Sequence, residues 1–183
     1  MVDAWDQNHF AHAACLAAAC PERDSETFWI IWAESLRELR RYEEAKRCLA
    51  RARALTSKKG SPQIAIQYGH LLFAMGDFAG ATLAYREAIR FQPSHARGYI
   101  YAGFTLLRRG EIQKAIYVLE KGRRCTEGEL DELYANLAFA HRAAGTYGEA
   151  RNALLKALEI DPDYTVAKRA LADIEAAETS CNG

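Results

Sequence analysis

Three residues near the N-terminus, His9, His12 and Cys15, have side chains and a spacing that could bind a metal ion. Imidazole nitrogens and thiolates are zinc ligands, and residues three apart lie close together on a helix. Three such residues at successive steps of three drift around the helix axis, so one helix does not aim all of them at one ion. We therefore interpret them as surface or packing residues, and we predict no metal and no cofactor.

Other groupings that could support catalysis or nucleic-acid binding are weak. The chain has no Cys-x-x-Cys pair, no glycine-rich phosphate loop and no His-Glu-x-x-His sequence. Its carboxylates stand at solvent-facing spacings, so we propose no acid–base pair. Arginines and tyrosines alternate around Arg97, Tyr99, Tyr101 and Arg108, as on RNA-stacking surfaces, but Tyr99 falls at a core position and favours packing. We expect no enzymatic activity and no nucleic-acid partner.

Composition points to an ordinary soluble chain. The 24 basic residues balance 24 acidic ones, so no net charge favours nucleic acid or a membrane surface. Five cysteines without paired spacing are typical of reduced thiols. Residues 1–6 are acidic where a signal peptide is basic, and no apolar stretch is long enough to span a bilayer. We expect a cytoplasmic protein without a membrane partner.

The balanced total charge hides a gradient along the chain. Residues 37–59 contain nine basic and three acidic residues, whereas residues 127–178 contain eleven acidic and five basic ones. We interpret residues 37–59 mostly as a helix surface that faces solvent. Its functional interpretation is head-to-tail contact with the acidic end of another copy, or docking on an acidic partner.

A repeat must position any binding surface in this chain. Residues 62–129 contain one 34-residue unit written twice, and offsets of 36 residues backward and 35 forward extend the pattern. Four repeats result, at roughly 26–59, 62–95, 96–129 and 131–163, and a period of this size indicates a stack of similar units. The corresponding positions of the two central units are Gly69 with Gly103, Gly76 with Gly110, Phe78 with Ile112, Ala81 with Ala115, Tyr85 with Leu119, and Ala88 with Gly122.

Each repeat contains two apolar helical segments, helix A and helix B, with a short turn between them. Gly76, Gly110 and Gly145 follow helix A, where a left-handed residue usually ends a helix. Arg40 takes this place in the first repeat, so we expect about 1 kcal/mol of strain or a different turn there. We also expect an N-terminal helix over residues 4–20, with Phe10, Ala13, Ala14 and Ala17 on its apolar side, and a capping helix over residues 164–178.

The pattern resembles the tetratricopeptide repeat (TPR) family. The second repeat has Tyr68-Gly69, Leu72, Gly76, Phe78, Ala81, Tyr85, Ala88 and Pro93, and the fourth has Tyr134, Leu137-Ala138, Gly145, Tyr147, Ala150, Leu154, Ala157 and Pro162. Arg40, Ser57 and Glu127 depart from the family pattern at turn positions. The resemblance implies an all-α fold, a right-handed solenoid of antiparallel helix pairs within a single domain over residues 1–183. It also implies a concave groove, lined by the A helices, that binds peptides or partner helices.

In the register of this family the groove is lined by apolar residues with a basic rim. We therefore hypothesise a non-catalytic adaptor or chaperone-like module that binds a peptide with apolar anchors, with an acidic flank as an option. The alternative is a structural module whose apolar strip is covered by its own N-terminal helix, a second copy or a fixed complex. The proposed groove residues are Ile66, His70, Phe73, Arg97, Ile100, Phe104, Leu107, Arg108, Phe139 and Arg142.

One specialised function of the family is not expected. Members that grip the acidic C-terminal tails of large heat-shock chaperones use lysine, arginine and asparagine at fixed groove positions. These positions hold Ile30, Glu34, Gln67, Arg97 and Tyr101 in one register, and Ile66, His70, Tyr101, Glu132 and Asn136 in the next. Neither set makes such a clamp. The apolar strip is closer in character to the surface of secretion chaperones in this family.

Overall fold

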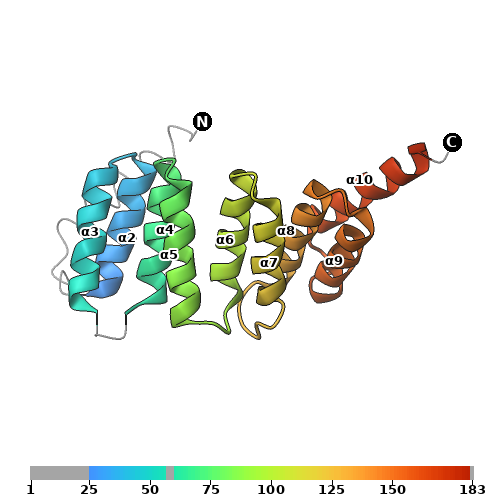
Figure 1. Cartoon of the computed structure of the whole chain (residues 1–183). Coiled ribbons are helices and arrows are strands. Elements are labelled where there is room, and N and C mark those ends of the chain that lie inside the picture. The colour runs from blue at the N-terminus through green and yellow to red at the C-terminus, as the bar shows by residue number, and fades with distance from the viewer. Residues whose placement is uncertain (1–24, 57–59, 182–183) are drawn as a thin grey trace. The chain divides into compact units, whose positions relative to one another are not determined.

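The computed structural model describes residues 25–56 and 60–181 of the chain (Figure 1). All regular elements in these ranges are helices, which confirms the predicted all-α solenoid of helix pairs. The N-terminal helix expected over residues 4–20 lies outside the described residues. The helices are α2 (Glu26–Glu38), α3 (Tyr42–Leu55), α4 (Pro62–Ala74), α5 (Phe78–Phe91), α6 (Ala96–Arg108), α7 (Ile112–Gly122), α8 (Leu130–Ala143), α9 (Tyr147–Ile160) and α10 (Thr165–Cys181).

The chain divides into two compact units, residues 1–91 and 92–183, which we call the N-terminal and C-terminal units. Successive helices pair across short turns, α2 with α3 and α4 with α5 in the first unit, and α6 with α7 and α8 with α9 in the second. Turns this short make the two helices of a pair antiparallel. Each unit has its own cluster of buried apolar side chains.

The N-terminal unit is held by large side chains that fit against small ones. Trp29, Leu36 and Leu49 are buried between α2 and α3. On α4, a Cβ placed on Gly69 would lie 2.3 Å from a ring carbon of Tyr85 on α5. The close approach of α4 and α5 therefore requires a residue without a side chain at this point.

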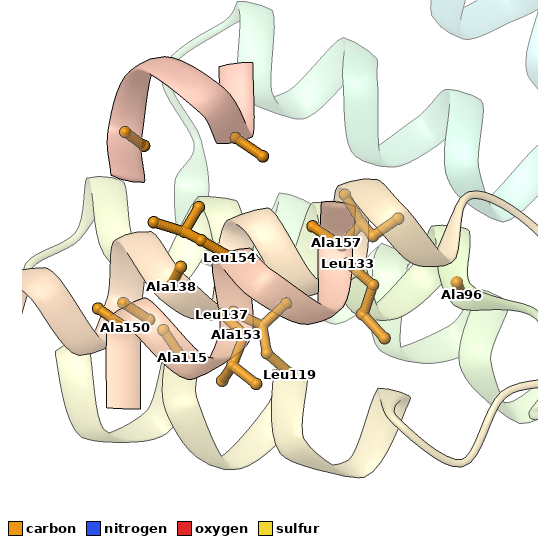
Figure 2. Packing of buried hydrophobic residues seen from close by; sticks show 14 of the residues in the cluster. Ala96, Ala115, Leu119, Leu133, Leu137, Ala138, Ala150, Ala153, Leu154 and Ala157 are labelled. Carbon is orange, nitrogen blue, oxygen red and sulfur yellow. The ribbon is translucent and has the colours of Figure 1, made fainter. Parts of the chain in front are cut away.

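The C-terminal unit repeats this packing over a longer stack. Leucines and alanines from successive helices interleave, among them Leu119 of α7, Leu133 of α8 and Leu154 of α9 (Figure 2). The unit ends with α10, which buries Ala167, Ala170 and Ile174 while Val166 stays 43% exposed. An apolar side toward the preceding helices and a charged side toward solvent is the arrangement expected of a capping helix.

The turns after helix A adopt the left-handed conformation that the sequence predicts. Gly76, Gly110 and Gly145 have φ values of 84°, 75° and 76°. Arg40 has a φ of 58° and is the one non-glycine residue with positive φ among those the structure describes. The first turn thus keeps the shape of the others, and the expected strain falls on Arg40.

Candidate peptide-binding surface

The ten predicted groove residues lie on three A helices, α4, α6 and α8. Ile66, His70 and Phe73 belong to the N-terminal unit, and the other seven belong to the C-terminal unit.

Backbone hydrogen bonds fix the beginnings of α6 and α8 to each other. The amide of Ala96 donates to the carbonyl of Glu127 at 2.9 Å, and the amide of Thr126 donates to the carbonyl of Ser94 at 3.0 Å. The two helices then run as neighbours. Side chains at equivalent turns of α6 and α8, such as Phe104 and Phe139, therefore belong to one surface.

The apolar residues of this surface differ in exposure. Phe104 is 43% exposed, while Leu107 and Phe139 are partly buried against the core of the C-terminal unit. We call Arg97, Phe104, Leu107, Arg108, Phe139 and Arg142 the α6–α8 face. Phe104 is its most exposed apolar member.

Ile100 is not part of an exposed strip, and the sequence-based expectation was wrong there. Its side chain is 2% exposed and belongs to the buried cluster of the C-terminal unit. Ile100 lies four residues before Phe104, which turns its side chain by about 40° around α6. This rotation directs it into the core, whereas Phe104 reaches the surface.

The three arginines have different surroundings. Arg97 donates to Glu129 at 2.8 Å, and this hydrogen bond raises the pKa of Arg97 and lowers the pKa of the Glu129 carboxyl. Arg142 places its guanidinium 5.5 Å from the centre of the Phe139 ring, within cation–π range. Arg108 is exposed. Arg108 and Arg142 are therefore better placed than Arg97 to meet a negative group on a partner.

Acidic residues at the beginning of α8 limit which part of this face suits an acidic ligand. Burial raises the pKa of the Glu132 carboxyl, and the neighbouring charges of Glu129 and Asp131 raise it further. Glu129 was not among the predicted site residues, although it decides how available Arg97 is. Glu129 and Arg97 are 32 residues apart in the sequence, so no local sequence signal indicated their contact.

The predicted residues of the N-terminal unit take part in packing. All three are partly buried. His70 shares a hydrogen bond of 2.9 Å between its Nδ1 and the hydroxyl of Tyr85, and the Phe73 ring meets the Phe78 ring edge-on at 5.0 Å. These contacts join α4 to α5, so His70 and Phe73 contribute to packing within this helix pair.

Metal ligation and membrane insertion have no support in the described residues. Across residues 25–56 and 60–181, no group of three His, Cys, Asp or Glu residues is arranged to hold a metal ion. His9, His12 and Cys15 lie outside these ranges. No helix in the described part of the chain has the length and apolar character needed to cross a membrane.

Comparison with known sequence families gives two matches in this chain. A tetratricopeptide repeat model matches residues 62–95, which are the second predicted repeat, and another matches residues 131–174. A search of curated proteins gave no match.

Solved structures with similar folds are TPR proteins. The C-terminal part of a TPR repeat-containing protein from Cytophaga hutchinsonii has 21% identity and a TM-score of 0.74, covering 94% of this chain and 68% of that chain. A thermophilic TPR protein of Thermus thermophilus has 17% identity and a TM-score of 0.72, covering 91% and 89%. YrrB, a TPR protein with an unusual peptide-binding site, has 16% identity and a TM-score of 0.63, covering 89% and 84%.

At such low sequence identities, the structural similarity shows a shared fold but does not indicate a shared ligand. The repeat matches add the sequence pattern to the fold. The chain therefore contains tetratricopeptide repeats at residues 62–95 and 131–174, and it has the fold of TPR proteins.

Proposed function

We propose that the α6–α8 face binds a peptide or a partner helix, and that this binding is the function of the chain. As a TPR protein the chain is a protein–protein interaction module. The observation that carries the finer proposal is the exposure of Phe104, a large apolar side chain 43% open to solvent on an A helix. Leu107 and Phe139 extend apolar surface beside it, and contiguous apolar surface usually marks an interaction site.

The chemistry of the face indicates the kind of partner. An apolar side chain of the partner would pack on Phe104, as an anchor residue does in helix and peptide recognition. A carboxylate of the partner would meet Arg108 or Arg142, since Arg97 is already paired with Glu129. That YrrB, which shares the fold, has a peptide-binding site supports the same use of this scaffold. No step of this proposal requires catalysis.

The test uses peptides selected on the wild-type chain from a phage-displayed random library. Binding of the best peptide is then measured by fluorescence polarisation. Phe104→Asp places a charge where the apolar anchor would pack, so we expect at least about tenfold weaker binding with unchanged helical content. The matched control is Tyr117→Asp, because Tyr117 is 62% exposed on helix α7, a B helix. Unchanged binding by Phe104→Asp would show that the face is not the site.

The arginines give a second test of the same proposal. With an acidic selected peptide, Arg142→Ala should weaken binding more than Arg97→Ala does, because Arg97 is held by Glu129. Equal effects would contradict the assignment of the charged contact to Arg142. The competing idea is a structural module whose face is covered by self-association. Light scattering at several concentrations distinguishes the two, because a monomer would leave the face available to partners.

A further inference from the structure

The side of helix A that faces the preceding helix B has a recurring role in the stack. We call the third, sixth and seventh residues of each repeat its leading side. They are Ile64, Gln67 and Tyr68 on α4, Leu133, Asn136 and Leu137 on α8, and Phe28, Ile31 and Trp32 on α2.

On α4 and α8 the leading side is covered by the helix B that comes before it. Ile64 is 5% exposed where α3 packs on α4, and Leu133 is 0% exposed where α7 packs on α8. The contact is close, because a Cβ on Gly122 of α7 would lie 2.8 Å from Leu133 Cδ1. On both helices, the third residue of the repeat is therefore buried by the preceding helix B.

The leading side of α2 has the apolar character of a covered surface. The Phe28 ring meets the Trp32 ring edge-on at 5.6 Å, and Ile31 is 55% exposed beside them. The indole N–H of Trp32 is buried without a hydrogen-bond partner among the described residues. No helix in the described ranges precedes α2. The leading side of α2 is thus apolar at the third and seventh residues of its repeat, as a covered surface is. It also exposes the apolar side chain of Ile31.

The sequence before α2 has the spacing of a helix B. Phe10, Ala14 and Ala17 precede Ala45, Leu49 and Ala52 by 35 residues, the same period that relates the third and fourth repeats. In α3 these three residues are buried, at 0%, 1% and 0% exposure, together with Cys48. Residues 21–25 then lead into α2, whose first turn is capped by the Ser25 hydroxyl. A connection of this length suits two antiparallel helices.

We propose that residues 4–20 form the helix B of a half-repeat and dock on the leading side of α2. The segment would turn its apolar side, which holds Phe10, Ala14 and Ala17, toward α2, with Ala17 at Phe28 as Gly122 lies at Leu133, extending the stack by one helix. This proposal does not depend on peptide binding.

Cysteine cross-linking in the full chain tests the placement. The background replaces Cys15, Cys20 and Cys181 with serine and keeps the buried Cys48 and Cys125. Ala17→Cys combined with Phe28→Cys reproduces the pair of positions that touch in Gly122 and Leu133. The matched control combines Ala17→Cys with Thr27→Cys, one residue away on a different side of α2. Mild oxidation, followed by mass spectrometry without reductant, measures the yields.

We expect an intramolecular disulfide in the Phe28→Cys pair, at least about five times more abundant than in the Thr27→Cys pair, since a disulfide forms only over a short Cβ separation. Equal yields, no disulfide in either pair, or disulfides between chains would each overturn the proposal. Between-chain disulfides would assign the leading side of α2 to a second copy.

A measurement without cysteines guards against disturbance by the Phe28 substitution. Phe10→Asp should unseat the segment and speed amide hydrogen exchange in α2, whereas Ala19→Asp, nine residues on and so on the opposite side of the predicted helix, should leave it unchanged. Equal exchange in the two variants would overturn the proposal. Phe10→Asp should also leave binding of the selected peptide within about twofold of wild type, as expected if that binding belongs to the α6–α8 face.

Discussion

Single glycines set the distance between the helices of a pair. A Cβ on Gly103 would lie 2.5 Å from Leu119 Cγ, so Leu119 occupies the space that a side chain would need. We predict that Gly103→Ala lowers the free energy of unfolding by about 1–2 kcal/mol, because overpacking outweighs the gain in helix propensity. Denaturant unfolding followed by circular dichroism measures the change.

The control for this prediction lies on α9. Gly148 is helical, and a Cβ added to it would meet no atom within 4 Å beyond its own stretch of helix. Gly148→Ala should therefore be neutral or stabilise by up to about 1 kcal/mol. A loss of stability equal to that of Gly103→Ala would show that packing against Leu119 is not the cause.

Arg40 stores strain that glycine would relieve. Its φ of 58° is in the left-handed region, which costs an L-residue about 1 kcal/mol. We predict that Arg40→Gly raises the free energy of unfolding by about 0.5–1 kcal/mol in chemical denaturation. The reverse change, Gly110→Ala at a φ of 75° with open space around it, should lower stability by a similar amount. The same sign for both substitutions would contradict this explanation.

Glu132 should make stability depend on pH in a sense opposite to Glu129. The raised pKa of Glu132 means that its charged form is disfavoured in the folded chain, so its contribution to stability falls as pH rises through that pKa. Glu132→Gln is expected to stabilise the chain at pH 7 by about 0.5 kcal/mol, a small figure because solvent screens this partly exposed group. The gain should vanish below about pH 4, where the carboxyl is protonated in both states.

The comparison variant is Glu129→Gln. Its hydrogen bond from Arg97 lowers the pKa of the Glu129 carboxyl, so this group stabilises the fold above its unfolded pKa and loses that effect as pH falls. Glu129→Gln should therefore destabilise at pH 7 and converge with wild type in acid. Thermal unfolding across pH values distinguishes the two signs, and equal signs would contradict the assignment.

At the scale of elements, the join between helix pairs can be made in more than one way. Glu127 stands where the second and fourth repeats have proline, and its carboxylate accepts hydrogen bonds from Gln92 Nε2 at 3.2 Å and Ser94 Oγ at 3.3 Å. Its amide also donates to the carbonyl of Ser94 at 3.2 Å. The segment before α6 and the segment before α8 are thus joined directly.

This join predicts that the family residue would harm the chain here. Glu127→Pro removes the amide donor and both side-chain acceptors, so we expect a loss of about 1–2 kcal/mol in the free energy of unfolding. Glu127→Gln keeps the amide and should cost less than about 0.5 kcal/mol. If proline is as well tolerated as glutamine in urea unfolding, the hydrogen bonds to Ser94 do not stabilise the join.

Helix positions followed from local signals in the sequence. Pro62 begins α4, glycines follow the A helices, and small residues recur at intervals that only a helix pair explains. The turn at Arg40 lacked that signal, yet the flanking repeat pattern imposed the same left-handed conformation. Side-chain exposure was harder to predict, because Ile100 and Phe104 have similar hydrophobicity and lie one turn apart.

At the scale of the molecule, the charge gradient is weakened by local pairing. Arg41 pairs with Glu44 and Arg53 with Glu87 near the basic stretch, while Arg151 pairs with Glu175 near the acidic one. We predict that head-to-tail association is detectable only at low ionic strength and is lost by about 0.5 M salt, where charges are screened within a few ångströms. Sedimentation velocity across salt concentrations measures this, and association that persists at high salt would rule out a charge-driven contact.

The sequence by itself determined the all-α class, the helix pairs and the left-handed turns, because a repeat writes each of these local requirements several times. It also placed Phe104 on a surface helix. Only the tertiary structure decided that Ile100 is buried and that Arg97 is held by Glu129. Those outcomes depend on the rotation of α6 in its unit and on a contact between residues 32 positions apart, which no local pattern encodes.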